Sequence, residues 1–341
     1  MRAVVYERGG ASDVLRLVER RVPEPGPGEV RVRVAVSGVN PTDWKARHRG
    51  GLATTVPPGG QVPHQDGAGT VDAVGPGVDT GRIGQRVWIW EAAWQRADGT
   101  AQEAVVLPED HAVELPGAAS FDLGASLGIP GMTAHRALTV HPSGPNCLGP
   151  GALAGRTVLV AGGAGAVGHA AIELARWSGA RVVTTVSSPA KAELAAAAGA
   201  HHVVNYRKPD AAEVIRKAAG RGVDIIVEVN PSANLRLDQH VLATGGVISV
   251  YADAGGSKLT VPIGPAMSAN LRLQFVLVYT MPPAAKTQAI ADLRAAVADG
   301  ALDVGAKAGL PLHRFPLART SAAHDAVEAS VVGKVLVDVP G

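Results

Sequence analysis

The run from Val160 to Gly168 constrains the fold of this chain more than any other stretch. Its residues, VAGGAGAVG, satisfy the spacing G-x-G-x-x-G at Gly163, Gly165 and Gly168. The run follows an apolar, strand-like segment and precedes a segment of helical composition. In that context small residues let the backbone approach a pyrophosphate, whose negative charge the helix N-terminus attracts. We therefore expect a dinucleotide-binding loop, the alternative being a tight turn that only packs a helix on a sheet. The residues expected to bind the cofactor there are Gly163, Ala164, Gly165, Ala166, Val167 and Gly168.

The chain around and after this loop alternates between strand-like and helix-like segments. Repeated βα units of this kind predict an α/β fold with a doubly wound parallel sheet. The Gly/Pro-rich stretch 141–155 has neither period and is expected to be an exposed connection. The predicted strands are Thr157–Ala161, Arg181–Val186, His202–Asn205, Val223–Val229, Val247–Tyr251 and Arg272–Tyr279, and the predicted helices include Ala190–Ala198, Ala211–Ala219 and Ala284–Asp299.

The first third of the chain has a different pattern, typical of β structure. Val30, Val32, Val34 and Val36 alternate with more polar residues, which is the period of a half-buried strand. Short strands separated by Gly/Pro turns predict a small barrel or sandwich. A last alternating segment, Lys334–Val339, is expected to return to this domain. The predicted domains are therefore 1–127 with 280–341, and 128–279.

Composition and charge exclude several classes of protein. The 341 residues carry a net charge of +2 without a basic block, so no nucleic-acid partner is expected. Cys147 is the only cysteine, which excludes an internal disulfide framework and a multi-cysteine zinc site. The longest apolar run, 157–175, contains His169 and Glu173 and is a poor membrane span. We expect a cytoplasmic protein that does not contact a membrane.

The end of the second predicted strand of the parallel sheet indicates which dinucleotide is preferred. An NAD site usually carries an acidic residue there, and this chain has none between Val186 and Lys191. It offers Ser187, Ser188 and Lys191, whose hydroxyls and ammonium suit a 2′-phosphate. Tyr206, after the third strand, adds a phenol. These residues predict NADPH, although Ser188 is equally suited to begin a helix and Lys191 to be solvated.

Several motifs, taken in order, resemble one known family. They include Gly38-Val39-Asn40-Pro41-Thr42-Asp43, Asp66-Gly67-Ala68-Gly69, Gly128-Ile129-Pro130-Gly131-Met132-Thr133 and Gly333-Lys334-Val335. Their order and spacing are similar to those of the zinc-independent quinone oxidoreductases of the medium-chain dehydrogenase/reductase superfamily, the zeta-crystallin-like group. The resemblance implies a GroES-like β-barrel domain, a Rossmann domain and a cofactor between them.

The same resemblance bears on metal binding. Zinc-dependent relatives place a cysteine where this chain has Asn40 and a histidine ligand where it has Gln65, while His64 lies one residue early. Only Asp66 remains as a plausible ligand, and a catalytic zinc needs about three. No metal is expected.

The resemblance also implies roles for individual residues. Asn40 is expected beside the nicotinamide, where its amide would donate to the substrate oxygen, unless it is an ordinary turn residue before Pro41. Thr133 is expected to help hold the carboxamide. Lys45 falls where the family can have a tyrosine. Further cofactor contacts are expected at Asn234, Tyr251, Ala252, Asp253, Val276, Leu277, Val278 and Lys334.

These observations predict an enzyme that transfers a hydride from NADPH to a quinone. The alternatives are an NADPH-dependent enone or enoyl reductase of the same superfamily and, from a different class, a non-catalytic NADPH-sensing or RNA-binding protein. The segment Arg272–Tyr279 has few charges, and as the last strand of its sheet it would leave an edge open for pairing. We therefore expect a homodimer.

Overall fold

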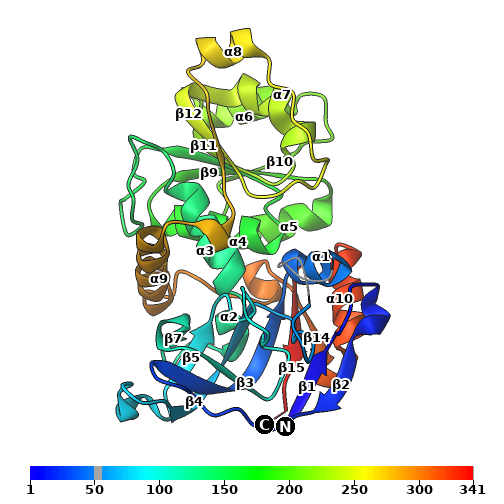
Figure 1. Cartoon of the computed structure of the whole chain (residues 1–341). Helices are drawn as coiled ribbons and strands as arrows, with labels where there is room; N and C mark the ends of the chain where they lie inside the picture. Colours follow the sequence, from blue (N-terminus) through cyan, green and yellow to red (C-terminus); the bar gives the residue numbers. More distant parts are fainter. Residues whose placement is uncertain (50–55, 341) are drawn as a thin grey trace. The chain divides into compact units, whose positions relative to one another are not determined.

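The computed structural model describes residues 1–49 and 56–340 of the chain and divides it into two compact units (Figure 1). The first unit comprises Met1–Ile129 and Leu312–Gly341, and the second comprises Pro130–Pro311. Residues 280–311, predicted from the sequence to belong to the first domain, lie in the second unit. The helix Pro283–Ala298 is attached to the second unit through Asp292. This side chain accepts a hydrogen bond of 2.7 Å from His135 and another from the backbone N–H of Leu148.

The first unit is built around a seven-stranded sheet, in which six strands follow the order β14-β15-β3-β4-β5-β7 and the seventh, β6, pairs with β3. The long strand β3 pairs with β4 along most of its length, and it also pairs with β6 through residues 29–33 and with β15 through residues 36–39. The alternating valines predicted to face a core are buried, Val30 and Val32 completely. The strands are β3 (Glu29–Val39), β4 (Asp66–Val74), β5 (Arg86–Ile89), β6 (Ala104–Pro108), β7 (Ala112–Glu114), β14 (Leu312–Pro316) and β15 (Lys334–Asp338).

The C-terminal strand returns to this unit as the alternation predicts. In Figure 1, β15 in red lies between β14 and the blue strand β3. A separate antiparallel pair joins β1 (Arg2–Val5) to β2 (Arg16–Glu19). The helices and 3₁₀ turns of this unit are α1 (Pro41–Arg49), α2 (Phe121–Gly124), α10 (Thr320–Glu328), η1 (Ser12–Val14), η2 (Thr80–Arg82), η3 (Glu109–His111) and η6 (Leu317–Arg319).

The second unit contains a six-stranded, wholly parallel sheet in the order β10-β9-β8-β11-β12-β13. This is the doubly wound order, with its topological switch between β8 and β11. The fold class predicted from the sequence is confirmed. The strands are β8 (Thr157–Ala161), β9 (Arg181–Val186), β10 (His202–Asn205), β11 (Val223–Glu228), β12 (Leu242–Val250) and β13 (Arg272–Phe275).

Helices occur between these strands at nearly the predicted positions. The last predicted strand is shorter than expected, because the chain turns after Phe275 and enters a 3₁₀ turn. The helices and turns are α3 (Gly128–Leu138), α4 (Ala166–Trp177), α5 (Pro189–Ala197), α6 (Ala211–Ala219), α7 (Pro231–Val241), α8 (Ile263–Ser268), α9 (Pro283–Ala298), η4 (Val278–Thr280) and η5 (Ala306–Ala308). No helix of the described ranges 1–49 and 56–340 is long and apolar enough to span a membrane.

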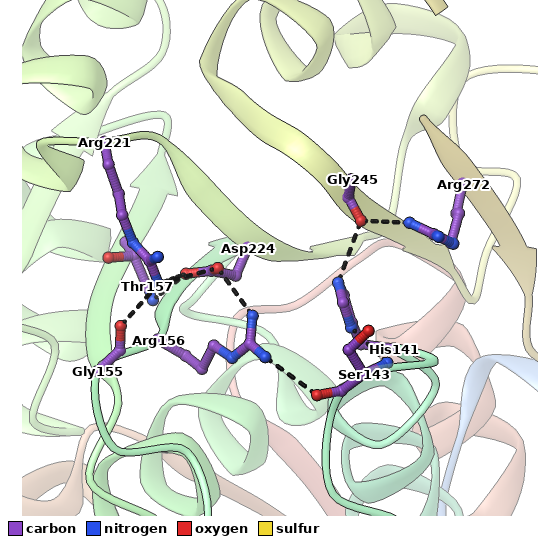
Figure 2. Close-up of polar contacts among 9 residues, drawn as sticks. All are labelled: His141, Ser143, Gly155, Arg156, Thr157, Arg221, Asp224, Gly245 and Arg272. Carbon is purple, nitrogen blue, oxygen red and sulfur yellow. Dashed lines mark hydrogen bonds and ion pairs between the residues drawn. The ribbon is translucent and has the colours of Figure 1, made fainter. Parts of the chain in front are cut away.

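The stretch 141–155 is irregular, as predicted, but it is not simply exposed. Leu148 and Leu153 are buried. Figure 2 shows its polar attachments: Arg156 donates to Ser143 O at 3.0 Å and to Asp224 Oδ1 at 3.1 Å. His141 Nε2 lies 3.1 Å from Gly245 O, which also accepts from Arg272. The stretch is thus fastened directly to Gly245 of β12 and, through Arg156 at the start of β8, to Asp224 of β11.

Candidate functional site

The glycine-rich loop between β8 and α4 has the geometry that close approach of a phosphate requires. A Cβ on Gly168 would lie 2.4 Å from the carbonyl oxygen of Gly162, so no side chain fits there. A Cβ on Gly165 would meet only Gly162 O, at 3.5 Å, and Gly165 is exposed. Gly168 therefore allows the loop to pack closely against the helix, and Gly165 leaves the backbone accessible to a ligand.

The N-terminus of α4 supplies donors beside this opening. The first hydrogen bond that reaches back from the helix joins His169 N to Gly165 O at 2.8 Å. The amides of Ala166, Val167 and Gly168 have no acceptor within the helix, as in any first turn. Together with the helix dipole they attract an anion to the loop. The loop residues expected from the sequence thus fit a pyrophosphate.

The residues expected to select the dinucleotide lie at the same carboxyl edge of the sheet. Ser187 and Ser188 follow β9, and the backbone N–H of Tyr206 donates to Val186 O at 3.1 Å, which brings the end of β10 beside them. Ser188 caps α5, because its hydroxyl accepts from Lys191 N at 3.4 Å. Tyr206 is 45% exposed. No carboxylate lies between Val186 and Lys191.

The other expected contacts of the second unit lie along the same edge. Tyr251 and Ala252 follow β12 and are half-buried, while Asp253 is exposed. Asn234, on α7, donates to Glu228 Oε1 at 2.9 Å. Val276 N donates to Val250 O at 2.8 Å. Val276 and Val278 are buried and Leu277 is half-exposed. Thr133 lies on α3 and is 6% exposed.

In the first unit, Asn40 belongs to a buried polar cluster. Its Nδ2 donates to Asp66 Oδ2 at 2.7 Å, and its Oδ1 accepts from Lys334 Nζ at 2.8 Å. Ile129 N donates to the other oxygen of Asp66 at 2.8 Å. Asn40, Asp66 and Lys334 are all at most 2% exposed. Lys334, expected from the sequence among the cofactor contacts, is instead buried as the partner of Asn40 and Asp66. Lys45 lies on α1 and is half-buried.

Burial shifts the protonation of this cluster. Burial raises the pKa of Asp66, although the charge of Lys334 and the hydrogen bonds from Asn40 and Ile129 lower it in part. Burial also lowers the pKa of Lys334. Asp43 accepts a hydrogen bond of 2.6 Å from Asn40 N, and burial raises its pKa to about 8. One ammonium thus lies among two carboxyl groups, and the better-hydrogen-bonded one, Asp66, is better suited to hold the charge.

His64, His324 and Ser37 form a second buried polar cluster, which the sequence does not predict. His64 Nε2 lies 2.9 Å from Nε2 of His324 on α10, and His64 Nδ1 lies 2.8 Å from Ser37 Oγ. Burial lowers the pKa of both imidazoles, that of His324 to about 3, so both are neutral at physiological pH. Nothing in the sequence near His324 indicates that it meets His64, which lies 260 positions away.

The residues at the position of a catalytic zinc do not suit that metal. Gln65 Oε1 accepts from Ala93 N at 3.1 Å, and the Asp66 carboxylate lies 3.7 Å from the ammonium of Lys334. Two amides and one carboxylate paired with an ammonium are a poor donor set for zinc. Within residues 1–49 and 56–340, no three His, Cys, Asp or Glu side chains gather as metal ligands.

A cavity of about 410 Å³ lies in the first unit, beside these clusters. Its size is within the range of small-molecule sites, roughly 300–1,000 Å³. Arg96, on its wall, is 3.5 Å from Glu29 and is therefore already paired. Thr54 and Thr55, which precede Pro57 in the sequence, lie outside the described residues. The polar residues of the wall include Tyr6, Asp43, Gln61, His64 and Gln65, and its apolar residues include Pro57, Pro58 and Pro63.

Comparisons with known proteins agree with this fold. The model of the alcohol dehydrogenase GroES-like domain matches residues 26–117, and that of the zinc-binding dehydrogenase matches residues 166–295. The quinone oxidoreductase of Lama guanicoe is 32% identical over 98% of this chain and 97% of its own length.

Two solved structures are similar along almost the whole chain. An NAD-dependent alcohol dehydrogenase has a TM-score of 0.85 at 29% identity and covers 100% of both chains. A mycobacterial protein in complex with NADPH has a TM-score of 0.81 at 29% identity and covers 99% of both chains.

The barrel unit, the doubly wound sheet and the phosphate loop define an oxidoreductase of the medium-chain dehydrogenase/reductase class. Within that class, the chain belongs to the quinone oxidoreductase family.

Proposed function

We propose that this protein is an NADPH-dependent quinone oxidoreductase that works without a metal. The observation that carries the proposal is the carboxyl edge of the parallel sheet, where an open phosphate loop lies in the same row as a carboxylate-free, hydroxyl-rich turn. The family supports the choice of reaction. The alcohol dehydrogenase among the similar structures is NAD-dependent, so the choice of NADPH depends on the residues of this chain.

On the cofactor side, each group of residues has a separate task. The amides of Ala166, Val167 and Gly168 bind the pyrophosphate, and Gly165 leaves room for it. Ser187, Ser188, Lys191 and Tyr206 bind the 2′-phosphate through hydroxyl groups and one ammonium. When bound, NADPH supplies a hydride.

On the substrate side, Asn40 is the donor to the developing negative charge on a carbonyl oxygen. One N–H of its amide is engaged by Asp66, and Lys334 holds the amide oxygen, so the orientation of the amide is fixed and the second N–H remains for substrate. The cavity lined by Pro57, Pro58 and Pro63 accepts a flat, uncharged ring. The proton that completes the reduction comes from water.

The test is steady-state oxidation of NADPH and, separately, of NADH by the purified protein with an ortho-quinone. Fast consumption of NADPH with little use of NADH supports both the reaction and the cofactor. Equal use of the two dinucleotides contradicts the assignment of Ser187, Ser188, Lys191 and Tyr206. Binding of NADPH without quinone turnover contradicts the quinone substrate, and an enone is then the next acceptor to assay.

The edge of the sheet supports a homodimer. β13 has a free edge in the described part of the sheet, and four apolar side chains close to it in sequence are exposed: Ile263, Met267, Phe275 and Leu277. A second copy that pairs along β13 would cover them. Sedimentation should give the mass of two chains, and Phe275→Asp should give one. A monomeric wild-type protein contradicts the dimer.

A further inference from the structure

Two buried carboxyl groups of the second unit have no counter-charge. Glu228, at the end of β11, and Asp238, on α7, are 0% and 1% exposed. Glu228 Oε1 accepts hydrogen bonds from Asn230 N and Asn234 Nδ2. Glu228 Oε2 and both oxygens of Asp238 are buried without a hydrogen-bond donor. An ionised carboxylate that lacks donors is costly to bury, because nothing replaces the water it has lost.

A proton on one of the two carboxyl groups removes this cost. The helix α7 that carries Asp238 packs on β11, which ends at Glu228, and the two carboxyl groups interact with one another. Because an ionised carboxylate has no donor, a hydrogen bond between them forms only when one of them is protonated. Burial raises the pKa of both, and repulsion from Glu228 raises that of Asp238 further. Asp238 is therefore the donor and Glu228 the acceptor. Glu228 then receives three hydrogen bonds, which suits an ionised carboxylate.

The titratable groups nearby do not supply a counter-charge for Glu228 and Asp238. Burial raises the pKa of Tyr251, which follows β12, and the charge of Glu228 raises it further. On α7, Arg236 and His240 are exposed, and His240 lies 3.1 Å from Glu213 of α6.

The pair also lies beneath the loops that the sequence assigns to the cofactor. Tyr251 N donates to Glu228 O at 3.1 Å, and Ala254 N donates to Val229 O at 3.4 Å, so the loop after β12 lies against the loop after β11. A Cβ on Gly255 would lie 1.9 Å from Asn230 Oδ1, which shows how closely the two loops pack. Glu228 thus holds Asn230, Asn234 and Tyr251 together at the carboxyl edge of the sheet.

We propose that Glu228 and Asp238 share one proton, and that this pair acts as a positioning device for the cofactor by holding Asn234 and the loops after β11 and β12. The role in positioning depends on the proposed function, whereas the shared proton does not. Loss of the proton leaves two buried negative charges side by side. Their repulsion pushes Glu228 away from Asp238 and releases Asn234, so cofactor affinity falls at alkaline pH.

The first experiment measures the Kd of NADPH by fluorescence titration from about pH 7 to about pH 10. When binding requires one proton, the Kd rises by about tenfold for each pH unit above the pKa of the group that holds it. In the wild type the Kd should rise by about tenfold or more over this range. In Asp238→Asn the amide N–H donates to Glu228 at every pH, so the rise should be much smaller. Glu213→Gln, which removes an exposed carboxylate in contact with α7, is the matched control and should keep the wild-type profile. An equal rise in wild type and Asp238→Asn overturns the positioning role.

A second measurement keeps the shared proton testable if NADPH fails to bind at any pH, a result that would contradict the proposed function. Unfolding of the ligand-free protein by urea is compared between wild type and Asp238→Asn across the same range and down to about pH 4. The folded wild type holds a proton that the unfolded chain has released, so the variant should gain stability relative to the wild type as the pH rises. A difference that does not change with pH overturns the shared proton.

Discussion

The side-chain ammonium of Lys334 donates a hydrogen bond of 2.8 Å to the amide oxygen of Asn40, and both residues are at most 2% exposed. The two residues lie 294 positions apart, on β15 and at the end of β3. A lysine in the last strand therefore controls the orientation of the residue proposed to contact substrate.

Replacement of Lys334 by methionine should destabilise the protein by about 3–5 kcal/mol, because it leaves Asp66 and Asn40 buried without their cation. Urea unfolding measures the effect. Lys258→Met, at an exposed position of the second unit, is the control and should change stability by less than about 0.5 kcal/mol. A loss no larger than that of the control would mean that the ammonium contributes nothing to the core.

Asn40→Ala should lower the turnover number by about a hundredfold while the Kd of NADPH changes little, because the amide acts on charge that develops during the reaction. Steady-state kinetics and cofactor titration measure the two effects. Unfolding experiments on the variant should be run alongside, since Lys334 and Asp66 lose a shared partner. Unchanged turnover in a folded variant would make Asn40 a structural residue.

A carboxylate at the end of β9 should reverse the choice of dinucleotide. Ser187→Asp places a negative charge where the 2′-phosphate is expected, so the Kd of NADPH should rise by about tenfold or more, while that of NADH changes little or falls. Ser187→Asn, which is similar in size and uncharged, is the matched control. If both variants weaken NADPH equally, then size rather than charge decides the preference.

The two glycines of the phosphate loop should respond differently to alanine. Gly168→Ala forces a methyl group against Gly162 O, so it should destabilise the protein by about 1–3 kcal/mol. Gly165→Ala meets only one atom, at 3.5 Å, so stability should change little while NADPH binding weakens. Thermal unfolding and cofactor titration together check the pair. Normal NADPH affinity in Gly165→Ala would place the phosphate elsewhere.

Asp43 should make the protein less stable as the pH rises. Burial raises its pKa to about 8, whereas an unfolded chain has about 3.9, so stability declines across this interval, by up to about 1.4 kcal/mol per pH unit. Asp43→Asn keeps an acceptor for Asn40 N and removes the titration. The stability of the variant should therefore depend less on pH between these values. Parallel profiles would show that Asp43 is ionised throughout.

Periodicity and glycine spacing predict the strands and the phosphate loop because both depend on neighbouring residues. Strand β8 and helix α6 have the predicted bounds, and Lys334–Val339 joins the first unit as expected. The burial of Lys334 could not be predicted, because a lysine in a strand is usually solvated and its partners come from β3 and β4. Asp238 has the sequence context of an exposed helix face, and only the packing of α7 on β11 shows otherwise. The sequence does not predict strand β14, because Leu312–Pro316 includes a histidine, an arginine and a proline.

The place of β15 between β14 and β3 also affects how the chain folds as it is made. Residues 130–311 form one continuous segment and can fold as soon as they leave the ribosome. The barrel cannot close until residues 334–338 emerge, so residues 36–39 of β3 lack their β15 partner through nearly all of synthesis. An exposed edge of β3 during that interval is a site for mispairing with other chains. A slowly translated or truncated C-terminus should thus lower the yield of soluble protein far more than its few residues suggest.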